Sequence, residues 1–232
     1  MATLARRVAA ETVGSALLAA AVVGSGIMAE RLGGGQLALE LLCNTVATGC
    51  ALAVLILVLA PVSGAHFNPA VSAVFAIRGE LSTHDLALYV VAQVCGAVLG
   101  VALAHLMFAL PVFTASDHAR SGAAQWLSEL VATAGLLAAI LGTRSRPQLA
   151  PFAIALYICS AYWFTASTSF ANPALTIARS LTHSFAGIAP ADVAPFMGAQ
   201  LAGALIANWF FGWLLGRARE DAPSTLRAER SS

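Results

Sequence analysis

Two asparagines, Asn68 and Asn172, occupy the same short motif, Asn-Pro-Ala, between long apolar stretches. The asparagine oxygen suits the cap position before a helix, and proline suits the first helical position. Each motif therefore predicts the start of a short helix. The carboxamide also carries two N–H donors, which can serve a polar solute. Two matching copies favour one shared central constriction over capping alone, and its residues are Asn68, Pro69, Ala70, Asn172, Pro173 and Ala174.

Two carboxylates, Glu11 and Glu129, lie inside apolar stretches, each ahead of its own Asn-Pro-Ala copy. A carboxylate at membrane depth is costly and usually has a function. The pair could relay protons. Their matching placement favours another role, in which each supports the loop before its motif by accepting hydrogen bonds from the loop backbone.

Three further side chains lie near the motifs. His66, two residues before Asn68, could expose a ring nitrogen to a pore or pack within its loop. Arg179 and His183 follow the second motif near the expected end of its short helix. Cations are favoured at a helix C-terminus, so a surface role is the default for both.

The elements that hold these residues are apolar. Of the 232 residues, 59% are hydrophobic and only 10% are charged, against about 25% charged in a soluble domain. The composition therefore predicts an integral membrane protein without a sizeable soluble domain. The four cysteines all fall in apolar stretches without metal-ligand spacing, so we expect buried free thiols, no metal and no cofactor. A thiol that lined a pore would still react with mercurials.

Six stretches approach the length of about 20 apolar residues that a spanning helix needs. They cover residues 9–29, 38–60, 86–110, 123–142, 150–166 and 193–215. Two shorter stretches, 68–78 and 172–182, begin at the motifs and cannot span. The sequence thus predicts an all-α membrane protein with six transmembrane helices and two re-entrant half-helices.

The two halves repeat. Each contains a glutamate, an Asn-Pro-Ala copy and then Ala-Gln-x-x-Gly-Ala, at 92–97 and 199–204. Because each half has three spanning helices, the halves must be inverted relative to each other, and such repeats put a solute path at the midplane. We expect a first repeat over 1–110, a second over 111–216 and a cytoplasmic tail over 217–232. Nine arginines against three favour both termini in the cytoplasm.

The motifs, the paired glutamates and the repeated Ala-Gln-x-x-Gly-Ala resemble those of the aquaporin and aquaglyceroporin family (the major intrinsic proteins). The resemblance covers about residues 5–216 and implies six tilted helices, two half-helices that meet head to head, and a homotetramer in which each subunit has its own pore. Facing half-helix N-termini would repel protons and cations from the pore centre.

The outer filter departs from the family pattern. Most members carry arginine directly after the second motif and an aromatic residue on the second helix, whereas this chain has Leu175 and Thr48. Ser160 and Ser169 complete the filter that the resemblance implies. Loss of arginine removes charge and a fork of donors, so the filter should be wider and less cationic. Arg179, one turn further on, could restore charge in the outer vestibule, although a side chain reaching the membrane surface is the favoured expectation.

The resulting function is a passive channel, in the inner membrane, for water and small neutral solutes such as glycerol, urea or metalloid hydroxides, including arsenite. The resemblance favours a bacterial, metalloid-conducting branch. A water-selective channel, a secondary active transporter and a poorly conducting junction-like protein are the alternatives. No nucleophile–base pair or phosphate loop indicates an enzyme, and nothing indicates nucleic acid as a partner.

Overall fold

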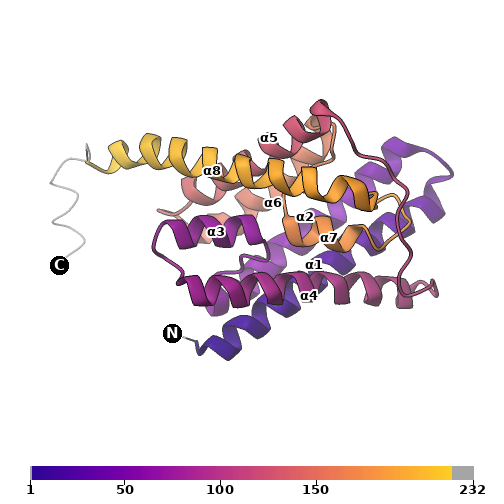
Figure 1. Cartoon of the computed structure of the whole chain (residues 1–232), viewed down its shortest axis with the longest axis horizontal. Coiled ribbons are helices and arrows are strands. Elements are labelled where there is room, and N and C mark those ends of the chain that lie inside the picture. The colour runs from indigo at the N-terminus through magenta and orange to yellow at the C-terminus, as the bar shows by residue number, and fades with distance from the viewer. Residues whose placement is uncertain (1, 221–232) are drawn as a thin grey trace.

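The computed structural model describes residues 2–220 and shows a bundle of long helices around two short ones (Figure 1). The α-helices of this part of the chain are α1 Leu4–Gly33, α2 Leu37–Ser63, α3 Pro69–Ile77, α4 Thr83–Met107, α5 Ala123–Gly142, α6 Ala150–Phe164, α7 Pro173–Arg179 and α8 Pro190–Glu220. The start of α1 and the end of α8 lie at the same end of the bundle.

Five of the six predicted spans, α1, α2, α4, α5 and α8, are long and apolar enough to cross a membrane. The sixth, α6, has 15 residues, or about 22 Å at 1.5 Å per residue. It follows a 3₁₀ turn, Pro147–Leu149, and ends at Phe164, where Thr165 becomes extended. The predicted end at 166 was therefore too late, because the chain turns into a re-entrant loop.

Both short helices begin where the motifs predicted. Asn68 and Asn172 have extended backbone and accept hydrogen bonds from the amides of Ala70 and Ala174, with the motif prolines in the first turn. Figure 1 shows α3 directed toward one end of the bundle and α7 toward the other. Their N-termini therefore meet in the interior.

The repeated Ala-Gln-x-x-Gly-Ala brings pairs of long helices into close contact. A Cβ atom on Gly96 of α4 would collide with the Thr12 carbonyl of α1, and one on Gly203 of α8 would collide with the Leu130 carbonyl of α5. Small residues allow such backbone approach between membrane helices. The approach places the glutamine of each motif beside the glutamate of the neighbouring helix.

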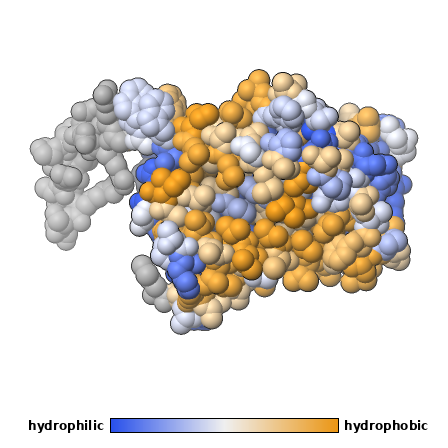
Figure 2. All heavy atoms as spheres, viewed as in Figure 1, coloured by the Kyte–Doolittle hydropathy of each residue, from blue (hydrophilic) through white to orange (hydrophobic). Residues whose placement is uncertain are grey.

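The outer surface of the bundle is apolar between polar ends, as the hydrophobic band in Figure 2 shows. Three cysteines lie on the surface rather than in the interior: Cys43, Cys50 and Cys95 are exposed, and Cys159 is half-buried. The expectation of buried thiols was wrong, because a lipid-facing surface is as apolar as a core and composition alone cannot separate the two.

The last helix is longer than predicted. α8 continues through residues 217–220, which were assigned to the tail, and its end extends beyond the neighbouring helices (Figure 1). The remainder of the predicted tail, 221–232, lies outside the described residues.

Candidate pore and outer filter

The two asparagines meet at the centre of the bundle and cross-link the two loops. Asn68 Nδ2 donates to the Ala171 carbonyl at 2.7 Å, and Asn172 Nδ2 donates to the Phe67 carbonyl at 2.8 Å. Each side-chain oxygen caps its own helix. A carboxamide nitrogen has two hydrogens, so each asparagine retains one N–H for a solute.

The loops before the asparagines have unusual backbone. Ala65, Phe67, Thr168, Ser169 and Ala171 all have positive φ angles, between 47° and 59°. Such residues cost about 1–3 kcal/mol each and persist only where the surroundings hold them. The loops therefore need strong anchors.

Glu11 and Glu129 supply these anchors from opposite halves of the chain. Glu11 accepts from the amides of His66 at 3.0 Å and Phe67 at 2.7 Å. Glu129 accepts from the amides of Phe170 at 2.9 Å and Ala171 at 2.8 Å. Both carboxylates are fully buried. Their oxygens are occupied by hydrogen bonds to the loops, which favours loop support over a proton relay.

Gln93 and Gln200 complete the anchors, although sequence reasoning gave them no role. Gln93 Nε2 donates to Glu11 at 2.8 Å and to the Ser72 hydroxyl of α3 at 2.9 Å. Gln200 makes the equivalent bonds to Glu129 at 2.6 Å and to Thr176 of α7 at 2.8 Å. The repeated glutamine was the available signal, since it recurs in the same order as the glutamates.

A cavity of about 340 Å³ passes both asparagines. On the α3 side its wall includes Phe75 and Arg144, and on the α7 side it includes Leu175 and Arg179. Between them the lining is mainly aliphatic, from α1, α2, α5 and α6: Leu18, Val22, Leu52, Ile56, Leu136, Ile140, Ile154 and Ile158. Apolar walls with a few aligned donors suit a small neutral solute that carries hydroxyl groups.

Three of the four predicted filter residues line the α7 end of this cavity. Thr48 and Leu175 are buried in its wall, and Thr48 accepts a hydrogen bond from the Tyr162 hydroxyl at 3.4 Å. Ser169 is also buried there, and its hydroxyl has no partner among the described residues. That hydroxyl is therefore free to bind a solute.

Ser160 is the exception. It is exposed on the outside of α6, and its hydroxyl bonds back to the Tyr157 carbonyl at 2.7 Å. The cavity wall on α6 is formed instead by Ile158 and Tyr162. The assignment of Ser160 to the filter was wrong by two residues, which on a helix is enough to turn a side chain away from the interior.

Arg179 does not reach the surface, contrary to the favoured expectation. It is 2% exposed and lines the cavity. Its guanidinium carbon lies 3.3 Å from the centroid of the Phe170 ring, and Nε donates to the Ala186 carbonyl. His183, by contrast, is exposed and pairs with Asp117 at 3.1 Å, as a surface residue should.

Arg120, which sequence reasoning placed only in an outer loop, fastens that end of the cavity. Its guanidinium donates to the carbonyls of Gly187 at 2.8 Å, Ser167 at 3.2 Å and Phe185 at 3.2 Å. It also lies 5.0 Å from the Phe170 ring centroid, on which Arg179 stacks. Burial lowers the pKa of Arg120, but arginine stays protonated near neutral pH.

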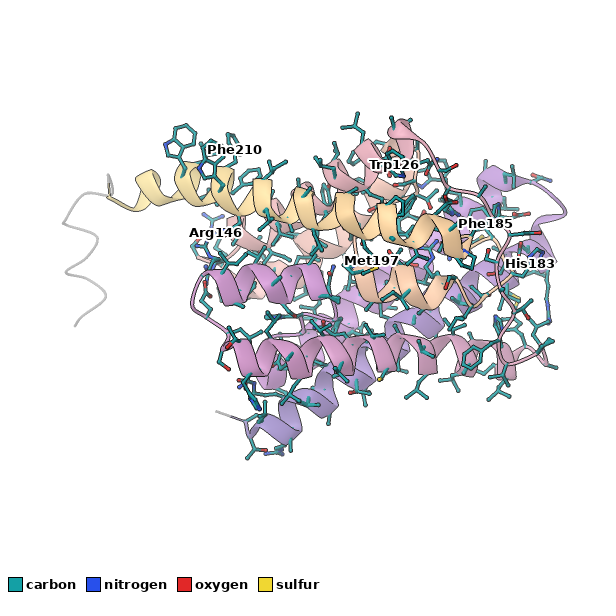
Figure 3. All side chains as sticks on the ribbon, in the orientation of Figure 1. Trp126, Arg146, His183, Phe185, Met197 and Phe210 are labelled. Atoms are coloured by element: carbon teal, nitrogen blue, oxygen red, sulfur yellow. The ribbon has the colours of Figure 1, made fainter. Side chains whose placement is uncertain are left out.

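The opposite end is closed by ion pairs. Glu80, after α3, pairs with Arg78 at 3.2 Å and with Arg144, which follows α5. Arg144 also lies 5.7 Å from the Phe75 ring centroid and lines the cavity. Figure 3 places Arg146, of the same loop, at the end of the bundle opposite to His183 and Phe185.

Both alternatives for His66 hold. Its Nδ1 lies 3.0 Å from the Ser72 hydroxyl and its ring packs 4.5 Å from Phe75, so it is fixed within the loop. It also contributes to the cavity wall.

Comparison with known proteins agrees with this architecture. Residues 1–169 match the family model described as major intrinsic protein. The chain belongs to the major intrinsic protein family. The expected resemblance to aquaporins and aquaglyceroporins is thereby confirmed.

Individual relatives of this major intrinsic protein agree. The chain is 56% identical over 217 residues to aquaglyceroporin AqpS of Rhizobium meliloti, covering 93% of each chain. It is 28% identical over 227 residues to aquaporin Z of Bradyrhizobium diazoefficiens, covering 90% and 93%. The solved aquaglyceroporin of Plasmodium falciparum matches 95% of this chain and all of its own, with a TM-score of 0.75 at 20% identity, which supports the fold.

The cavity of this family member predicts a pattern of thiol sensitivity. None of the four native cysteines lines the cavity, so a methanethiosulfonate reagent should leave water permeability unchanged. Ser169→Cys should become inhibited, because position 169 is in the cavity wall. Ser160→Cys is the matched control and should stay insensitive. Stopped-flow shrinkage of vesicles before and after treatment measures both, and inhibition of Ser160→Cys alone would contradict the assigned wall.

Proposed function

We propose that the protein is a passive channel for water and small neutral solutes, with the cavity past Asn68 and Asn172 as its pore. The observation that carries the proposal is the pair of crossed asparagines, each with a spare N–H, in an otherwise apolar cavity. The N-termini of α3 and α7, each with about half a positive charge, disfavour cations at this point. A neutral hydroxylated solute loses little there, because the donors replace water.

The outer filter consists of Thr48, Ser169 and Leu175, with Tyr162 in the place that Ser160 was expected to fill. Leucine and threonine leave this level without charge and without a large aromatic side chain. Solutes larger than water therefore fit the proposal, and the candidates are glycerol, urea and undissociated metalloid hydroxides such as arsenite. The 56% identity to a protein named an aquaglyceroporin supports a solute range beyond water.

The assembly is proposed to be a homotetramer of two-repeat subunits in the bacterial inner membrane. The first repeat is 1–110 and the second is 111–216, supported by the equivalent bonds of Glu11 and Glu129 and by the opposed directions of α3 and α7. The start of α1 and the end of α8 share one end of the bundle, which supports termini on one side, the cytoplasmic side by the arginine distribution.

Stopped-flow measurements on reconstituted vesicles test the function. We expect water, glycerol, urea and undissociated arsenite each to cross faster than in protein-free vesicles, without dependence on a proton gradient. Passage of water alone would favour a water-selective channel. A steep dependence of uptake on an imposed proton gradient would favour a secondary transporter.

A further inference from the structure

One positive charge in the cavity wall has no counterpart at the usual family position. Arg179 is buried, lines the cavity and makes one side-chain hydrogen bond within residues 2–220, from Nε to the Ala186 carbonyl. The terminal N–H groups of its guanidinium are therefore available to a solute in the cavity. Stacking on Phe170 at 3.3 Å fixes the plane of the guanidinium.

No carboxylate pairs with Arg179 in the described part of the chain. Arg120, 5.0 Å from the same phenylalanine ring, adds a second positive charge without an ion-pair partner in that part. The outer end of the cavity is thus net positive, in surroundings that screen charge poorly. A cation entering there meets repulsion before it reaches the asparagines.

The position of this charge along the pore also differs from the family pattern. Arg179 follows Leu175 by four residues on α7, so it shares that helix face about 6 Å further along the axis. The level of Leu175, Thr48 and Ser169 carries no charged side chain, while the next level carries Arg179.

We infer that the outer filter has two separate levels: Leu175, Thr48 and Ser169 set its width, and Arg179, one helical turn further out, excludes cations and donates hydrogen bonds to the oxygens of neutral solutes. This inference rests on the proposed channel function. It explains how an opening wide enough for glycerol or urea can still reject cations of the same size. Width and charge selection, which one arginine combines in most family members, are here divided between two turns of α7.

Urea and the guanidinium ion test the separation, because they have nearly the same planar shape and differ in charge. In vesicles, removing the charge in Arg179→Met should raise the guanidinium-to-urea permeability ratio about tenfold, the size expected for one charge acting over about 10 Å at an effective dielectric constant of about 20. Arg179→Lys keeps the charge and should keep the ratio near that of the wild type. Arg31→Met removes an exposed arginine outside the cavity wall and should leave the ratio unchanged.

The outcomes separate the inference from the channel function. If the wild type passes urea and Arg179→Met keeps its low guanidinium-to-urea ratio, the two-level filter is overturned and the channel stands. If wild-type vesicles pass neither glycerol nor urea, the channel function itself fails. Where Arg179→Met does not fold, Arg179→Gln replaces it, since its amide can still donate to the Ala186 carbonyl; a low ratio in that variant also overturns the inference.

Discussion

Leu175→Arg lowers glycerol and urea permeability about tenfold or more while water permeability falls much less. Leu175 is in the cavity wall at the level of Thr48 and Ser169, so a longer side chain narrows the opening there. An added barrier of only about 1.4 kcal/mol slows passage tenfold, and glycerol meets the obstruction before water does. Stopped-flow measurements with wild-type and variant vesicles give both permeabilities.

Two companion variants make this result specific. Leu175→Met keeps the apolar volume and should conduct glycerol like the wild type. Leu175→Arg combined with Arg179→Leu moves the positive charge back one turn without adding one, so narrowing should persist while cation exclusion is kept. Glycerol permeability equal to that of the wild type in Leu175→Arg would show that this position does not limit the pore.

Glu129→Gln destabilises the protein and reduces water permeability several-fold. The carboxylate accepts from the Phe170 and Ala171 amides and from Gln200. An amide has only one oxygen, so at least one buried donor faces another donor, and each unsatisfied donor costs about 1–3 kcal/mol. The loop, with Ser169 and Ala171 at positive φ, then loses the anchor that holds it. Thermal unfolding in detergent and vesicle swelling measure the two effects.

Thr133→Val is the matched control for Glu129→Gln. Thr133 lies one turn further along α5, fully buried, and its hydroxyl has no hydrogen-bond partner among the described residues. Valine should therefore change neither stability nor permeability appreciably. A Glu129→Gln protein as stable and permeable as the wild type would mean that the loop is held by other contacts.

The sequence by itself determined the features that depend on residue type and order. Asparagine followed by proline specifies a helix start wherever it occurs, so Asn68 and Asn172 were placed as caps. A carboxylate in a membrane needs partners, and the matched order of Glu11 and Glu129 before the two motifs indicated which loops they contact. Composition alone required a membrane protein, and length alone separated half-helices from spanning helices.

Only the tertiary structure decided which way side chains face on helices that are apolar all round. A soluble helix reveals its buried face by its polar side, but lipid and protein interior accept the same residues, so neither Ser160 nor the cysteines could be oriented from the sequence. Arg179 was misplaced for a related reason. Its long side chain could have reached the surface, and only the neighbouring Phe170 and the Ala186 carbonyl, brought by two separate loops, hold it against the cavity.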